Sequence, residues 1–124
     1  MFTDGAGLCF FGSFTGNGAD DGPVVNMNNS KPKNVMVFRT GSATSGYFID
    51  YNTVRNPHNV CTRMFLLDNS GNEYAGPGLE SDILATGWKA RDGNNGMNAS
   101  EQIIISAWGL RPLGGSGVAQ ARAR

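Results

Sequence analysis

A chain of 124 residues is the right size for one domain, and its ten basic and ten acidic side chains leave no formal net charge. This balance argues against a protein that binds nucleic acid or a membrane surface through bulk charge. Eighteen glycines and only 16% charged residues indicate a turn-rich fold, while 10% aromatic residues offer enough apolar surface for an ordered core.

Targeting signals are not evident in the sequence. The longest apolar run, residues 8–11, is far shorter than the roughly 20 residues of a membrane helix. The first residues, Met1 to Gly5, have neither the basic region nor the apolar region of a secretory signal. We therefore expect neither a membrane helix nor a secretory signal, and no membrane partner.

Short apolar or alternating segments follow one another along the chain, separated by clusters of glycine, asparagine, aspartate and proline. The expected strands are residues 8–14, 24–27, 34–40, 46–51, 62–67, 83–91 and 102–110. Apolar residues never recur at helical spacing over three turns, and a short turn at residues 79–84, capped by Ser81, is the one helical alternative. This pattern predicts an all-β fold, a single compact antiparallel β-sandwich of about seven or eight short strands, jelly-roll-like in organisation.

The strands also predict which side chains form the core. Val35 and Val37 should face one side of their strand, with Met36 and Phe38 on the other. The run of isoleucines at 103–105 is apolar on both faces, which predicts a central strand or one covered by a neighbouring chain. Trp88, between a glycine and a lysine, should cover one end of the sandwich.

The C-terminal segment differs from the body at residues 1–110. Residues 111–124 have no periodicity, contain three glycines and three arginines, and have no acidic residue. The body therefore holds the balancing negative charge. We expect an extended arm that contacts a neighbouring subunit, with a solvated tail as the alternative. The expected interface residues of this arm are Arg111, Val118, Arg122 and Arg124.

The two cysteines, Cys9 and Cys61, are too few for a disulfide scaffold. We expect two reduced, mostly buried thiols, because unbonded cysteine is among the most buried residue types. A single disulfide between them is the alternative.

Candidate catalytic and metal-binding residues are sparse. His58, the only histidine, has Cys61 and Asp50 near it in sequence, but nothing fixes these groups within hydrogen-bonding reach of one another. Zinc needs more closely spaced nitrogen and sulfur ligands than this chain offers. Calcium in the loops at residues 20–21 and 92–95 is an alternative to simple turn closure by Asp and Asn side chains. We expect no enzyme activity, no resident metal and no cofactor.

Two aromatic residues near amide-rich loops, Tyr51 and Trp88, could face a carbohydrate ligand. A pair of acidic residues that acts on a polysaccharide is a further alternative. The alternative is that both rings simply belong to a turn-rich sandwich.

Several ordered stretches make the chain resemble a family of small β domains of unknown function, found in tail-fibre-like and other virion proteins of tailed bacteriophages. They read FTGNG at 14–18, DGP at 21–23, KPKNVMVFR at 31–39, IDYNTVRNPHN at 49–59, GWKAR at 87–91, NAS at 98–100 and QIIISAW at 102–108. The segment before Pro112 departs from the pattern, because family members more often have an acidic or amide residue there. The resemblance implies a structural role in the virion, with assembly in the cytoplasm of the host bacterium.

Within the fourth stretch, Asp50, Arg55 and His58 are candidates for bracing a loop or contacting a partner. The planar donor fork of Arg55 suits Asp50 or a neighbour's carboxylate, whereas a plain surface loop is the alternative.

The expected function is therefore that of a non-enzymatic virion protein. The sequence has no shaft, coiled coil or collagen-like repeat, so a long fibre is not expected. We favour a capsid decoration (cement) protein, assembled as a homo-oligomer such as a trimer and bound to other capsid or tail proteins. A tail-fibre or tail-tip component that binds a host glycan is the alternative. Nucleic acid is not an expected partner.

Overall fold

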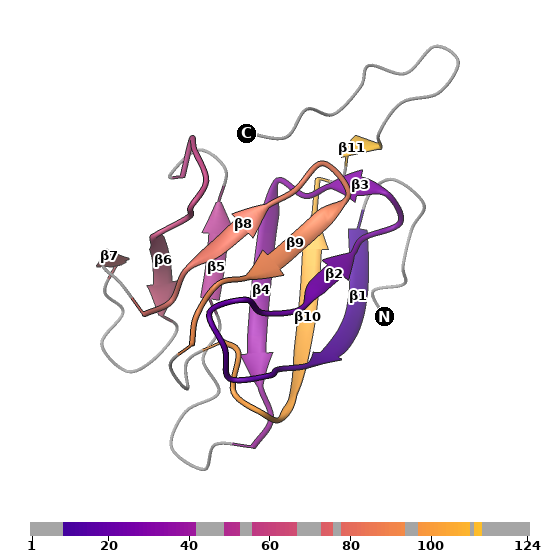
Figure 1. Cartoon of the computed structure of the whole chain (residues 1–124). Coiled ribbons are helices and arrows are strands. Elements are labelled where there is room, and N and C mark those ends of the chain that lie inside the picture. Colours follow the sequence, from indigo (N-terminus) through magenta and orange to yellow (C-terminus); the bar gives the residue numbers. More distant parts are fainter. Residues whose placement is uncertain are drawn as a thin grey trace.

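The computed structural model describes residues 9–41, 49–52, 56–66, 73–75, 78–93, 97–109 and 111–112, and within them it contains strands and turns but no helix. Figure 1 shows how the strands are arranged. In chain order they are β1 (Cys9–Thr15), β2 (Val24–Asn26), β3 (Ser30–Lys31), β4 (Asn34–Arg39), β5 (Ile49–Asn52), β6 (Arg63–Leu66), β7 (Glu73–Ala75), β8 (Ser81–Ile83), β9 (Gly87–Ala90), β10 (Gln102–Trp108) and β11 (Arg111–Pro112).

The strands form three antiparallel sheets. The largest has six strands in the order β1-β10-β4-β5-β6-β7, the second has the order β2-β9-β8, and β11 pairs with β3. The three-stranded sheet lies across one face of the six-stranded sheet, so that the two make the layers of a sandwich (Figure 1). The prediction of an all-β, antiparallel β-sandwich is confirmed.

Strand β10 is central, as the isoleucine run predicted, because it pairs with β1 on one side and β4 on the other. Ile103 and Ile105 are fully buried between the two layers, whereas Ile104 is 47% exposed on the opposite face. The same alternation holds in β4, where Val35 and Val37 are fully buried and Met36 and Phe38 are not.

The core fills the space between the layers. Its buried apolar side chains are Val25, Met27, Val35, Val37, Cys61, Met64, Ile83, Trp88, Ala90, Met97, Ile103, Ile105 and Ala107. Cys61 is buried and Cys9 is half-buried, and both are thiols, in agreement with the prediction. Trp88 has no exposed surface and its ring lies 5.6 Å from that of Phe14. A ring with no exposed surface does not face a ligand, so that expectation for Trp88 is wrong.

Two predictions for residues 79–91 also need correction. Residues 83–91 form no continuous strand, because the chain turns between β8 and β9, where the Leu84 amide donates to the Gly87 carbonyl at 2.8 Å. The short helical turn at 79–84 is absent, since Ser81, Asp82 and Ile83 form β8 and pair with β9. Pairing with β9 satisfies their backbone groups and buries all three residues, which an isolated turn of helix would not achieve.

The short strands β3, β7 and β11 were not expected. Arg111 pairs with Lys31 and Pro112 with Ser30, so regular pairing continues past the predicted end of the body at residue 110. The rest of the predicted arm, residues 113–124, lies outside the described residues.

Candidate functional site

The six-stranded sheet has an outer face, which is turned away from β2, β8 and β9 and on which Ile104 is exposed. Side chains alternate along a strand, so the residues between the buried core positions of β1, β10 and β4 belong to this face. They are Cys9, Phe11, Ser13, Thr15, Gln102, Ile104, Ser106, Trp108, Asn34, Met36 and Phe38. We call this set the outer face.

Ile104 lies near the middle of the outer face. It pairs with Ser13 of β1 on one side and with Phe38 of β4 on the other. Further along the strands, the rings of Phe11 and Trp108 meet edge to face, with their centroids 6.2 Å apart. The outer face therefore combines an exposed aliphatic side chain with half-buried aromatic rings.

The outer face has no charged side chain within β1, β10 and β4. At one end of these strands the Arg39 Nε–H donates to Glu101 Oε1 at 2.6 Å. In the adjacent strand, Asp50 of β5 lies opposite Met36 of β4. The ion pair neutralises Arg39 and Glu101, so the uncharged part of this face is limited to β1, β10 and β4.

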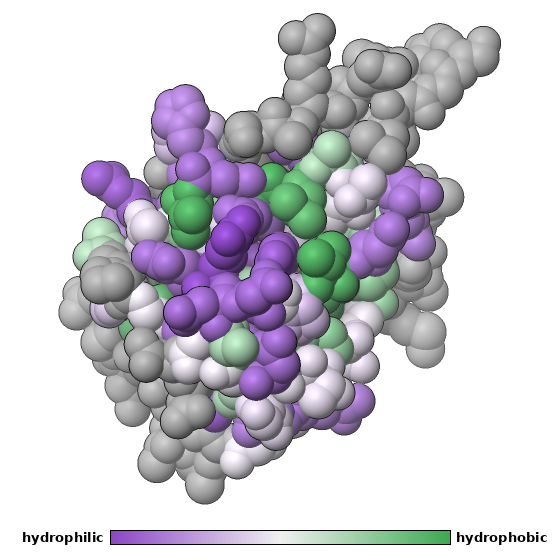
Figure 2. All heavy atoms as spheres, in the orientation of Figure 1, coloured by the Kyte–Doolittle hydropathy of each residue, from purple (hydrophilic) through white to green (hydrophobic). Residues whose placement is uncertain are grey.

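The opposite side of the sandwich, over the three-stranded sheet, is largely hydrophilic with separate hydrophobic spots (Figure 2). Lys89 of β9 forms an ion pair with Asp21, and the Arg91 Nε–H donates to Asp82 Oδ2 at 2.5 Å. The hydrogen bond from Lys89 and its positive charge, together with the more distant charge of Arg91, lower the pKa of the exposed Asp21 carboxyl.

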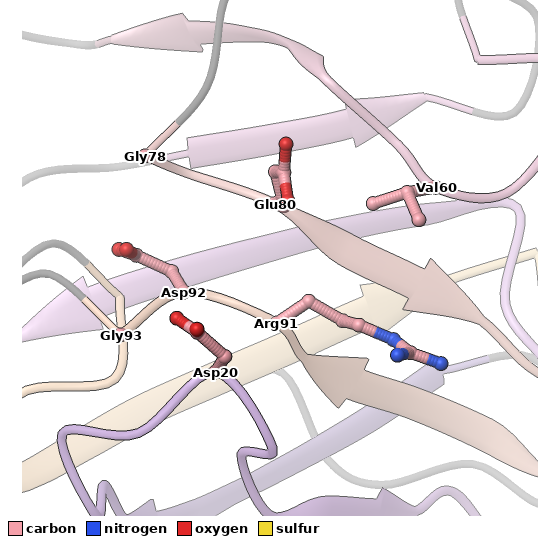
Figure 3. A pocket seen from close by; sticks show the side chains of 7 residues that line it. All are labelled: Asp20, Val60, Gly78, Glu80, Arg91, Asp92 and Gly93. Carbon is pink, nitrogen blue, oxygen red and sulfur yellow. The ribbon is translucent and has the colours of Figure 1, made fainter.

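This hydrophilic side contains an open hollow of about 380 Å³. Figure 3 shows the carboxylates of Asp20, Asp92 and Glu80 around it, while the guanidinium of Arg91 points away from them. Asp92 is only 2% exposed and accepts a hydrogen bond from the Met97 amide at 3.3 Å. The carboxylate of Asp92 therefore helps to hold the loop that follows β9.

The calcium alternative concerned these loops. Among the described residues, no three His, Cys, Asp or Glu side chains are close enough to hold a metal ion together. Asn94 and Asn95, the other oxygen donors of that alternative, lie outside the described residues.

The residues singled out from the sequence are not gathered at one place. Asp50 and Tyr51 lie in β5, opposite Met36 and Val35, and His58 is exposed in the bend that follows. Arg111 lies in β11. Trp88 is in the core, as described above. The remaining predicted contact residues, Arg55, Val118, Arg122 and Arg124, lie outside the described residues.

Sequence reasoning missed the role of several asparagines. The fully buried Asn98 accepts a hydrogen bond from the Asn17 amide through Oδ1, and its Nδ2 donates to Asn17 Oδ1 and to the Ala19 carbonyl. In addition, the Gly18 amide donates to the Asn98 backbone carbonyl at 2.7 Å. These bonds fasten the loop after β1 to the segment before β10.

A second group of asparagines fastens the bend at residues 56–60. Asn56 Oδ1 accepts from the amides of Thr62 and Arg63, and its Nδ2 donates to the Arg63 carbonyl at 2.7 Å. Asn59 binds both the amide and the carbonyl of Ile83, each at 3.0 Å. The side chain of Asn59 thus makes the two backbone hydrogen bonds that a neighbouring strand would make to Ile83. All of these asparagines lie in the stretches that suggested the phage resemblance, which was the available signal.

No helix in the part of the chain that the structure describes is long and apolar enough to cross a bilayer.

Comparison with known proteins gives one family. The sequence model of a domain of unknown function (DUF7483) matches residues 1–112, which is most of the chain, so the chain belongs to this family. Neither the curated proteins nor the solved structures contain a match.

Proposed function

We propose that this DUF7483 member is a structural, non-enzymatic protein of a tailed-bacteriophage virion, most simply a capsid decoration protein that acts through contacts between its copies and through its C-terminal arm. The observation that carries the proposal is the outer face in β1, β10 and β4, which has no charged side chain and on which Ile104 is 47% exposed. The exposed Ile104, near the half-buried rings of Phe11 and Trp108, supports a protein contact on this face.

The use of the polar motif residues also supports a structural role. Asn17, Asn56, Asn59 and Asn98 belong to the stretches that resemble phage virion domains, and each of them makes hydrogen bonds that hold loops in place. A rigid body with its loops tied down suits a protein that is repeated many times in a particle. Many identical contacts hold such a protein firmly even when each contact is weak.

Binding to emptied phage particles tests the proposal. The purified chain should bind purified heads to saturation, in a fixed ratio to the major capsid protein, as measured by co-sedimentation and quantitative gel analysis. Tails purified from the same particles are the matched control. Binding to neither heads nor tails would overturn the proposal, and binding to tails alone would move the protein to the tail-fibre or tail-tip position.

The same material separates the rival functions. A receptor-binding module should bind host glycans saturably, and a polysaccharide-acting enzyme should release sugars from host polysaccharide. The carboxylates of the hollow give the second test a variant, because Asp92→Asn should abolish such turnover if it depends on that site. We expect neither glycan binding nor sugar release.

A further inference from the structure

We infer that Asn59 and the bend at residues 57–60 close one edge of the three-stranded sheet, the edge at β8, against pairing with another chain. We call this feature the edge cap. The edge of a sheet presents backbone N–H and C=O groups that can pair with a strand of a second molecule. The inference goes beyond the proposed function and does not depend on it, because it concerns how copies of the chain are kept apart.

Strand β8 pairs with β9 through every second residue. The Arg91 amide donates to the Glu80 carbonyl at 2.8 Å, and these two residues continue the register of the β8–β9 pair. Hydrogen bonds between antiparallel strands recur at alternate residues, so the backbone groups of Ser81 and Ile83 point away from β9. These groups form the outer edge of the sheet.

All four of these outward groups have partners. Ser81 exchanges two backbone hydrogen bonds with Cys61, at 2.7 and 3.2 Å. The Ile83 amide donates to Asn59 Oδ1, and Asn59 Nδ2 donates to the Ile83 carbonyl, each at 3.0 Å. Neither Ser81 nor Ile83 has exposed surface. The edge of β8 is therefore satisfied without a fourth strand.

The side chain of Asn59 stands where the backbone of such a strand would be. Cys61 lies opposite Ser81, and an antiparallel strand in this register would place residue 59 opposite Ile83. A strand there would bond through its backbone and present a new edge of its own. Instead the side-chain amide makes both bonds and the chain bends at residues 57–60. The sheet ends at this point.

The other edge of the same sheet, at β2, is different. The Ala90 amide donates to the Pro23 carbonyl at 3.3 Å, so alternate pairing turns the backbone groups of Val24 and Asn26 away from β9. Among the residues that the structure describes, none makes a backbone hydrogen bond to these groups, and Val24 is 55% exposed. The three-stranded sheet thus has one open edge and one capped edge.

The difference between the two edges limits how copies can pair through this sheet. A copy with one open edge can pair only once, β2 with β2, and that contact closes a dimer. A copy with two open edges can pair β2 with β8 of the next copy, and this head-to-tail contact repeats without an end. The edge cap therefore keeps crowded copies from growing into a fibre through the three-stranded sheet.

Asn59→Ala in the full chain tests the inference, because it removes both side-chain bonds and opens the edge at Ile83. Hydrogen exchange of the Ile83 amide should become roughly tenfold faster or more. Sedimentation over a concentration series should show assemblies that are larger than those of wild type and grow with concentration. Circular dichroism and thermal melting establish that the variant is folded.

Asn26→Ala is the matched control. The Asn26 side chain also makes two hydrogen bonds, both to Asn29 in the turn after β2, at 2.9 and 3.1 Å. Its removal opens no strand edge, so this variant should sediment like wild type and keep the wild-type exchange rate at Ile83. A folded Asn59→Ala variant that sediments like wild type, or whose Ile83 amide exchanges at the wild-type rate, would overturn the inference.

The wild-type chain supplies a measurement that needs no variant, in case Asn59→Ala does not fold. The amides of Ser81 and Ile83, on the capped edge, should exchange at least about tenfold more slowly than those of Val24 and Asn26, on the open edge. Equal rates at the two edges would contradict the edge cap, as would open-ended assemblies of the wild-type chain joined through β8.

Discussion

Asn98 illustrates how single side chains hold the loops of this sandwich. With no exposed surface, it makes three side-chain hydrogen bonds to Asn17 and Ala19, at 2.6 to 3.0 Å. A loop between sheets has no neighbouring strand to satisfy its backbone groups, and a buried group without a hydrogen bond costs free energy. The amide of asparagine offers a donor and an acceptor at once, so it replaces a missing strand neighbour.

Asn98→Ala should therefore lower the free energy of unfolding by about 2–4 kcal/mol, because it removes these bonds and leaves the partner groups buried. Urea unfolding followed by tryptophan fluorescence measures the loss. Ser100→Ala changes an exposed residue of the same segment and should alter stability by less than about 0.5 kcal/mol. Equal stability of the two variants would show that the Asn98 bonds contribute little.

The sequence alone could not assign these roles. It showed that asparagines are frequent in the loops, and turn chemistry explains that frequency. Which loop each amide fastens depends on contacts between residues far apart in the chain, such as Asn17 with Asn98. In contrast, the shared face of Val35 and Val37 followed from local alternation, which depends on backbone geometry alone.

At the scale of elements, predictions succeeded where alternation was long and failed where strands were short. The seven residues of β10 give several repeats of the alternating pattern, and the position of β10 inside the sheet was predicted correctly. Strands β8 and β9 are short and fully or mostly buried, so their apolar residues gave no alternation to mark the turn between them. Strands β3 and β11 have two residues each and pair with each other. No local sequence pattern predicts a pairing between segments so far apart in the chain.

Gly87, the first residue of β9, lies where the neighbouring strand β2 leaves no room for a side chain. A Cβ atom at Gly87 would lie 2.0 Å from the Val25 carbonyl oxygen, because β2 approaches β9 closely there. Gly87→Ala must push the two strands apart, and we expect it to lower the free energy of unfolding by about 3 kcal/mol or more. Urea unfolding measures the change.

Gly12→Ala is the control for Gly87→Ala. At Gly12 the added Cβ meets only the far end of the Phe10 ring, which can move aside. We expect a change within about 1 kcal/mol. A Gly87→Ala variant as stable as Gly12→Ala would mean that β2 can shift without lowering the free energy of unfolding.

At the scale of the whole molecule, the sandwich has two unlike sides. One is hydrophilic and crossed by ion pairs, and the other has the outer face, which has no charged side chain in β1, β10 and β4. The buried apolar core of the described residues is formed by side chains between Val25 and Ala107. The proposed function gives the arm a role between subunits.

Deletion of residues 118–124 tests that role. The truncated chain should keep the thermal midpoint of the full chain, since the core residues are all present, but should occupy fewer sites on phage heads at equal concentration. Quantitative gel analysis of co-sedimented heads measures the occupancy. Replacement of Arg122 and Arg124 by glutamine keeps the length of the arm and separates the effect of charge from that of length. Full occupancy by the truncated chain would remove the arm from the proposal.

The bond network around Asn17 also bears on the chemical lifetime of the protein. An asparagine followed by glycine is prone to deamidation, which requires the glycine amide nitrogen to attack the asparagine side chain. Here the Gly18 amide is engaged with the Asn98 carbonyl, and the Asn17 side chain is bound to Ala19, Asp21 and Asn98. Both reacting groups are tied down while the chain is folded. Deamidation at Asn17-Gly18 therefore requires the loop to open. Particles stored intact should accumulate isoaspartate at residue 17 far more slowly than the denatured chain does.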